Sequence, residues 1–184
     1  IIYTSDNGAV PIMPPRSKYK KGSNFPLSRG KWDALEGGIR VPFVMAGPKI
    51  PGGQESKTPI TFSDLLPTLV DLAGGELPLN AQLDGGSFKN SLFKINQSKI
   101  KRPIKGLVFH VPYENGIALK RAHSSFIFPP YKLVKFYDNN KLSLYNLDTD
   151  IMESNDIASS NPTTLKFIEN MLDKYLETVK APKW

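Results

Sequence analysis

Two oxygen-bearing side chains follow a short apolar run at the start of the sequence. Ile1 to Tyr3 are β-branched or aromatic residues, typical of a buried strand, and Asp6, Asn7 and Gly8 indicate a sharp turn after it. In open α/β sheets, ligands bind outside the carboxyl ends of the strands, and carboxylate and amide oxygens suit a hard divalent cation. From these residues alone, a metal site at Asp6 and Asn7 and a hairpin turn with a solvated Asp6 are both open.

A long loop rich in proline and basic residues follows the turn. Residues 9–30 contain five cations, which are Arg16, Lys18, Lys20, Lys21 and Arg29. Irregular loops of this length are uncommon and are usually functional or disordered. Either the loop is a solvated basic segment, or it attracts an anionic substrate to a site beside Asp6. In the second interpretation Arg16 is a candidate substrate-binding residue.

The elements that would position these residues fall in two groups. In the first part of the chain, residues 41–48 are typical of a strand, and residues 61–74 have the spacing of a helix that begins at Ser63 or Asp64 and ends at Gly74. In the second part, residues 106–110 are a predicted strand. Residues 131–137 and 141–147 alternate with period two, which predicts an antiparallel hairpin with one solvated face. A last helix begins at Asn161 and Pro162.

Composition limits the classes of function. The 184 residues carry a net charge of +7, which favours acidic partners such as nucleic acid, an anionic membrane or an anionic saccharide. No basic helix or aromatic-interleaved patch of a nucleic-acid reader is present, so we expect no nucleic-acid partner. The absence of cysteine excludes disulfides, thiolate metal sites and a cysteine nucleophile within this sequence. No apolar run approaches the roughly 20 residues of a membrane span.

Several motifs together resemble the C-terminal half of a sulfatase. They are Thr4-Ser5-Asp6-Asn7-Gly8, then Asn24-Phe25-Pro26-Leu27 before Gly30-Lys31, then Glu36-Gly37-Gly38-Ile39-Arg40-Val41-Pro42. The likeness continues at residues 63–74, 84–87, 109–113, 131–133 and 144–158, and so covers nearly the whole chain.

The resemblance implies an alkaline-phosphatase-like α/β fold, one calcium ion and a formylglycine hydrate as the nucleophile. Carried over to this sequence, Asp6 and Asn7 match the last two calcium ligands. Lys31, five residues before Glu36, matches a lysine that contacts the sulfate group. The residue types suit this chemistry, because a calcium ion neutralises sulfate oxygens and a lysine stabilises charge that grows toward the transition state. Glu36 and Arg40 are expected to form an ion pair that fixes the bend.

The sequence also departs from the sulfatase pattern. The family's nucleophile arises within a Cys/Ser-x-Pro-Ser-Arg-like motif, and no serine here has that context. The chain opens in mid-strand without an initiator methionine, so we expect the motif and the other calcium ligands upstream of Ile1. On that expectation these 184 residues alone neither hydrolyse a sulfate ester nor bind calcium tightly. Pro129-Pro130 stands where the family often has a Gly-Asp turn, which leaves any substrate contact there open.

The two histidines allow different interpretations. His110 ends an apolar strand and precedes Pro112 and Tyr113. It is either a partly buried, hydrogen-bonded residue or a substrate-binding residue that contacts sugar hydroxyls at a pocket rim. His123 lies in a polar stretch, and we expect it at the surface.

The sequence therefore predicts an α/β fold, with residues 1–100 forming the C-terminal portion of a sulfatase catalytic domain and residues 101–184 a small α+β subdomain. The expected function is hydrolysis of a sulfated carbohydrate, because the basic loop suits a polyanion. One alternative is a phosphodiesterase or phosphonate monoester hydrolase, although those relatives usually carry a histidine where Asn7 stands. The other is a catalytically inactive, carbohydrate-binding homologue. The family implies a periplasmic or secreted protein, or a lysosomal one in a eukaryote.

Overall fold

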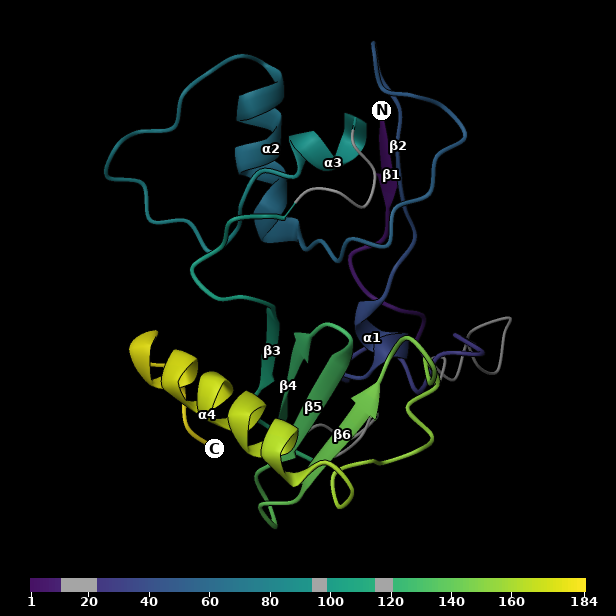
Figure 1. Ribbon diagram of the computed structural model, residues 1–184, viewed down its shortest axis with the longest axis vertical. Helices are drawn as coiled ribbons and strands as arrows, with labels where there is room; N and C mark the ends of the chain where they lie inside the picture. The colour runs from purple at the N-terminus through teal and green to yellow at the C-terminus, as the bar shows by residue number, and fades with distance from the viewer. Residues whose placement is uncertain (11–22, 94–98, 115–120) are drawn as a thin grey trace, which may run out of the picture. The chain divides into compact units, whose positions relative to one another are not determined.

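The computed structural model describes residues 1–10, 23–93, 99–114 and 121–184, and they pack as two compact units that interleave along the chain (Figure 1). The first unit contains Ile1–Ile2 and Met45–Leu107, and the second contains Tyr3–Val44 and Val108–Trp184. Each unit therefore joins segments that are distant in sequence. The sequence suggested a different division, into a catalytic-domain portion (residues 1–100) and a subdomain (residues 101–184). That division refers to the domains of the whole protein and stays a prediction.

The first unit is built around the helical segment predicted at residues 61–74. It begins as a 3₁₀ turn, η1 (Phe62–Asp64), continues as α2 (Leu65–Leu72) and stops before Gly74, whose φ is 72°. Asp64 is fully buried and accepts hydrogen bonds from the backbone N–H groups of Thr61 and Gly86 and from the guanidinium of Arg102. A short helix, α3 (Lys89–Phe93), packs against α2.

The strands predicted at the start of the chain and after the glycine pair are present but short. β1 (Ile2–Thr4) and β2 (Phe43–Met45) form a two-stranded sheet. The expectation that the first strand is buried is wrong for the described part of the chain, because 67% of Tyr3 and 94% of Ile1 are exposed.

The second unit contains a four-stranded sheet in the order β3–β4–β5–β6. The strands are β3 (Leu107–Val111), β4 (His123–Phe128), β5 (Tyr131–Phe136) and β6 (Leu142–Asn146). β4 and β5 are antiparallel, with Phe126 opposite Leu133, and β5 pairs antiparallel with β6. The predicted hairpin of residues 131–147 is confirmed, with Asn140 at a φ of 54° in its turn.

Both faces of the β4–β5–β6 sheet are covered, so the expectation of one solvated face is wrong. The helix α4 (Pro162–Thr178) packs on β4 and β5, and Figure 1 shows it lying across these strands. Its residues Ile168 and Leu172 are fully buried with Leu133. The opposite face is covered by the segment around Ala34 and Glu36, which contacts side chains of β4 and β5.

No helix in the part of the chain that the structure describes combines the length and the apolar character needed to cross a membrane.

Candidate active site

The turn at Asp6–Gly8 and the bend around the glycine pair touch through their backbones. The N–H of Gly8 donates to the carbonyl oxygen of Gly38 at 3.0 Å, and the N–H of Lys31 donates to that of Ala9 at 3.1 Å. A Cβ atom on Gly8 would lie 1.7 Å from the carbonyl oxygen of Gly37. The two strongest sequence motifs therefore meet, and glycine is required because the backbones approach so closely.

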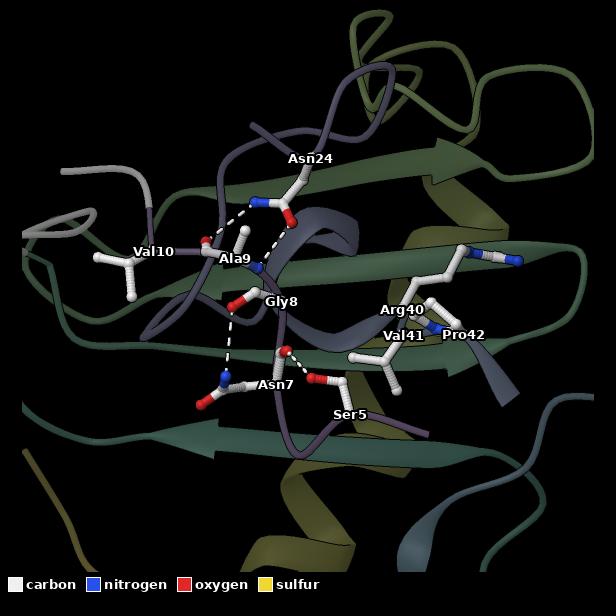
Figure 2. A pocket seen from close by; sticks show the side chains of 9 residues that line it. All are labelled: Ser5, Asn7, Gly8, Ala9, Val10, Asn24, Arg40, Val41 and Pro42. Atoms are coloured by element: carbon white, nitrogen blue, oxygen red, sulfur yellow. Dashed lines mark hydrogen bonds between the residues drawn. The ribbon is translucent and has the colours of Figure 1, made fainter. Parts of the chain in front are cut away.

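Asn24 holds the chain beyond the turn in place (Figure 2). Its Oδ1 accepts the N–H of Ala9 at 2.7 Å, and its Nδ2 donates to the carbonyl oxygens of Ala9 at 3.0 Å and Arg29 at 2.9 Å. One amide side chain thus satisfies three backbone groups and fixes residue 9 beside the segment that leads to Lys31.

A hollow of about 380 Å³ lies beside the turn. Its lining, drawn in Figure 2, consists of Ser5, Asn7, Gly8, Ala9, Val10, Asn24, Arg40, Val41 and Pro42. The candidate metal ligand Asn7 is therefore at a concave surface. The guanidinium of Arg40 points away from Asn7 in this view, so Arg40 lines the hollow mainly with its stem.

Asp6 and Asn7 stay candidate metal ligands, and the described residues do not form a complete metal site around them. Asp6 is exposed and its carboxylate has no hydrogen bond or ion pair with any described residue. Asn7 donates from Nδ2 to the carbonyl oxygen of Gly8 at 3.3 Å, a bond that does not use its Oδ1 acceptor. Calcium takes six to eight oxygen ligands. Within the described ranges, no group of three or more acidic or histidine side chains could hold a metal ion.

Lys31 lies between the turn and the bend. It is half-buried, its backbone is bonded to Ala9, and its Nζ is 5.4 Å from the centre of the Trp32 ring. Its ammonium forms no ion pair within the described residues, so its charge is available to an anion. The structure thus places Lys31 on the segment that contacts the Asp6–Gly8 turn.

Of the two predicted substrate-binding residues, His110 is the one that the structure describes, and it does not line this hollow. Arg16 lies outside the described residues. His110 is on β3, with Nδ1 2.6 Å from the hydroxyl of Ser124 and Nε2 2.8 Å from the carbonyl oxygen of Pro182. Since both ring nitrogens have partners, this geometry fits the hydrogen-bonded alternative, and a role for His110 in substrate binding stays a prediction.

Glu36 belongs to a buried charge cluster that the sequence revealed only in part. As expected, Arg40 Nε donates to its Oε2. In addition, Lys132 Nζ donates to its Oε1 at 2.9 Å and lies 2.8 Å from Oε1 of Glu153, while Oε2 of Glu153 accepts the N–H of Glu36 at 2.8 Å. Lys132 and Glu36 are 0% and 1% exposed.

Burial and charge act oppositely on the two carboxylates of this cluster. Burial raises the pKa of Glu36, but the charges of Lys132 and Arg40 outweigh it, so the pKa is lowered. For Glu153, burial dominates the attraction to Lys132 and the pKa is raised. Beyond the expected pair of Glu36 and Arg40, the sequence signal for this cluster is Lys132 itself, a lysine within an alternating strand.

The expectation that His123 lies at the surface is wrong. Its side chain is 0% exposed, and Nε2 accepts the N–H of Ala34 at 2.9 Å. Nδ1 therefore carries the proton and donates to the carbonyl oxygen of Arg121 at 2.6 Å. Burial lowers the pKa of His123. Its neighbours Ser124 and Ser125 are polar and so suggested a surface position, but both are buried as well.

Comparison with known proteins identifies the family to which the chain is similar. Residues 31–181 match the family described as "N-sulphoglucosamine sulphohydrolase, C-terminal". A sulfatase of Formosa agariphila is 28% identical over 89% of this chain and 29% of its own length. Human steryl-sulfatase is 32% identical over 71% of this chain and 22% of its own length. This chain thus spans between about a fifth and a third of these curated relatives.

Solved structures share the fold. The crystal structure of Ps i-CgsB in complex with k-i-k-neocarrahexaose is 27% identical, with a TM-score of 0.73 over 95% of this chain and 35% of that one. A second structure, in complex with its substrate D-glucosamine-2-N,6-O-disulfate, is 23% identical, with a TM-score of 0.68 over 97% of this chain and 34% of that one, and shows the fold alone.

This chain belongs to the sulfatase family, in the part that corresponds to the C-terminal domain of N-sulphoglucosamine sulphohydrolase. The resemblance drawn from the sequence motifs is confirmed, and so is the α/β class with an alkaline-phosphatase-like fold. The described chain shows the mixed α/β elements, the antiparallel sheet and the C-terminal helix of that fold.

Proposed function

We propose that this chain is part of an enzyme that hydrolyses the sulfate esters of a carbohydrate. The observation that carries the proposal is a pair of backbone contacts in a chain of the sulfatase family: Gly8 bonds to Gly38 of the bend, and Ala9 bonds to Lys31. The carbohydrate is favoured by the basic residues 9–30 and by the similarity to Ps i-CgsB, whose structure holds a neocarrahexaose. Membership of the family also favours a periplasmic, secreted or lysosomal location for the protein.

Asp6 and Asn7 would supply two oxygen ligands of a calcium ion, together with ligands from outside these two residues. Such an ion would neutralise negative charge on the sulfate oxygens. Asp6 suits this role because its carboxylate is exposed and has no partner among the described residues. Asn7 suits it because the hydrogen bond to Gly8 uses its Nδ2 and not its Oδ1, the oxygen that a cation would need.

Lys31 would bind the sulfate group by charge. Its backbone bond to Ala9 limits how far it can move from the turn, and the ammonium has no competing carboxylate within the described residues. A cation fixed beside the transferred group stabilises a transition state that carries more negative charge than the bound ester. Arg16, on the basic loop, would help attract the polyanion before it binds.

The nucleophile would be a formylglycine derived from a cysteine or serine of the sulfatase motif. These 184 residues contain no cysteine and no serine in that context. We therefore expect the nucleophile to come from a preceding part of the same protein, and we expect these residues alone to be inactive.

The test is a set of turnover measurements on the intact protein. Sulfated oligosaccharides and an aryl sulfate are compared with an aryl phosphodiester and a phosphonate monoester, in calcium and after chelation. We expect sulfate release that depends on calcium, and a loss of about 100-fold in kcat for Lys31→Ala. The matched control is Lys105→Ala, an exposed lysine of the first unit, which should leave kcat unchanged.

Two results would contradict the proposal. Turnover of the phosphodiester or phosphonate without sulfate release would assign the chain to a sister enzyme. Binding of the oligosaccharide without any turnover would indicate the inactive, carbohydrate-binding homologue.

A further inference from the structure

The ion cluster at Lys132 connects the sheet of the second unit to the segment that carries Lys31. Lys132 is on β5, and its Nζ lies 2.9 Å from Oε1 of Glu36 and 2.8 Å from Oε1 of Glu153. All three side chains are almost inaccessible to solvent. Two carboxylates therefore share one ammonium, and Arg40 supplies the second positive charge at the edge of the cluster.

A continuous series of contacts leads from this cluster to the candidate ligands. Glu36 is the first residue of α1 (Glu36–Ile39) and immediately precedes Gly37 and Gly38. The N–H of Gly37 donates to the carbonyl oxygen of Ser28 at 2.8 Å, and the carbonyl oxygen of Gly38 accepts the N–H of Gly8 at 3.0 Å. Gly8 in turn follows Asp6 and Asn7 directly.

The same cluster also fixes one end of the segment that contains Lys31. Oε2 of Glu153 accepts the N–H of Glu36, so both the backbone and the side chain of Glu36 are held. At the other end, Lys31 is tied to Ala9. A buried ion pair with hydrogen bonds to both partners allows one geometry, because any other arrangement leaves a charge unpaired in a medium of low polarity.

We propose that Lys132 is a positioning residue, which through Glu36 sets the place of Lys31 relative to Asp6 and Asn7. The proposal rests on the sulfatase function above, where Lys31 binds the sulfate. Lys132 itself is fully buried, so its ammonium is out of reach of a substrate. Its role is to hold α1 so that the Gly8–Gly38 contact forms. Lys31 and the oxygen atoms of Asp6 and Asn7 then face the same sulfate group.

The experiment compares variants of the intact protein by kinetics and by amide hydrogen exchange of residues 3–10. Lys132→Met leaves two buried carboxylates against one exposed guanidinium, so a second variant, Lys132→Met with Glu153→Gln, removes the excess charge and keeps an acceptor for the N–H of Glu36. The matched control is Lys135→Met on the opposite face of β5, where the lysine pairs with Glu169 and Asp173 of α4.

If Lys132 positions the bend, exchange at Gly8 should speed up by about tenfold or more in both Lys132 variants and stay unchanged in Lys135→Met. The kcat for a sulfate ester should fall between about 10- and 100-fold, with KM within about twofold, because the lysine is displaced rather than removed. In a Lys31→Ala background the same variants should cause no further loss of kcat.

The proposal is overturned if the double variant has a lower melting temperature but unchanged exchange at Gly8 and unchanged kcat, since that is the result of a purely structural role. It is also overturned if the losses from Lys132 and Lys31 variants multiply. If the intact wild type hydrolyses no sulfate ester, the proposed function fails, and the exchange at Gly8 alone decides whether Lys132 positions the bend.

Discussion

Gly8 and Gly37 approach each other so closely that a single methyl group would not fit between them. A Cβ atom on Gly8 would be 1.7 Å from the carbonyl oxygen of Gly37, and the N–H of Gly8 already donates to Gly38. The obstacle is backbone rather than a side chain that could rotate, so the turn itself would have to shift. The relative place of Asp6, Asn7 and the Lys31 segment therefore depends on this contact.

Replacing Gly8 by alanine should separate the turn from the bend. We expect Gly8→Ala to destabilise the protein by about 2 kcal/mol or more and to abolish most sulfatase activity, because overpacking against backbone forces a displacement. The measurement is urea denaturation together with kcat. Gly52→Ala serves as the control, since nothing lies within 4 Å of its Cβ position. Equal stability of the two variants would show that the contact is not tight in solution.

Asn24 provides a second test of the same arrangement. Asn24→Ala removes three hydrogen bonds to the backbone of Ala9 and Arg29. Because these bonds are exposed and water can replace them, the loss should cost about 1 kcal/mol. We expect faster amide exchange at Ala9 and Lys31. Asn170→Ala, at an exposed position of α4, is the comparison and should change neither quantity. Unaltered exchange at both amides would contradict the role assigned to Asn24.

The parts of the fold that depend on local pattern could be predicted from the sequence. The alternation of residues 131–147 and the Asn161-Pro162 start predicted β5, β6 and α4 correctly, because period and capping are local properties. The helix α1 was not predicted, since its Glu-Gly-Gly-Ile sequence has poor helix propensity. Its glycines are required instead because a Cβ atom on either would collide with the backbone of residues 28–33.

From the sequence, only those residues of the site that lie in a recognisable motif could be predicted. Asp6, Asn7 and Lys31 followed from a resemblance, and their roles stay predictions. The partners Lys132 and Glu153 could not be deduced, because 96 and 117 positions separate them from Glu36 and only folding brings them together. His123 shows the same limit, since a polar neighbourhood in sequence does not reveal that a backbone N–H needs its ring as an acceptor.

His123 should make stability depend on pH near neutrality. Burial lowers its pKa from the usual 6.5 against the opposing attraction of Asp33, so the unfolded state binds a proton at higher pH than the folded state. Stability is then fully present above pH 6.5 and decreases as the pH falls through that value toward the folded pKa. Denaturation midpoints between pH 5 and 8 should show this slope.

The variant His123→Gln should reduce that slope, because glutamine can accept from Ala34 without titrating. His110→Gln is the matched comparison at the other histidine. A slope that is identical in the wild type and in His123→Gln would show that other groups cause the pH dependence.

The buried ion pair of Asp64 and Arg102 should contribute more to the free energy of unfolding than the exposed pair of Asp71 and Lys89. Asp64 is 0% exposed, and Arg102→Met would leave its carboxylate buried with only backbone partners, at a cost of about 3 to 5 kcal/mol. Lys89→Met removes a pair whose side chains are 36% and 46% exposed and should change the midpoint far less. Urea denaturation measures both. A larger effect for Lys89 than for Arg102 would contradict the burial argument.

Calcium should stabilise the intact protein through Asp6 and Asn7. Because the carboxylate of Asp6 has no partner among the described residues, Asp6→Asn should be as stable as the wild type after chelation. In calcium the wild type should gain about 2.7 kcal/mol when the concentration is 100 times Kd, and the variant much less, because a charged ligand is lost. Asp148→Asn, at another exposed aspartate, should keep the full gain. Thermal denaturation with and without calcium measures these differences, and an equal calcium shift in all three proteins would remove Asp6 from the metal site.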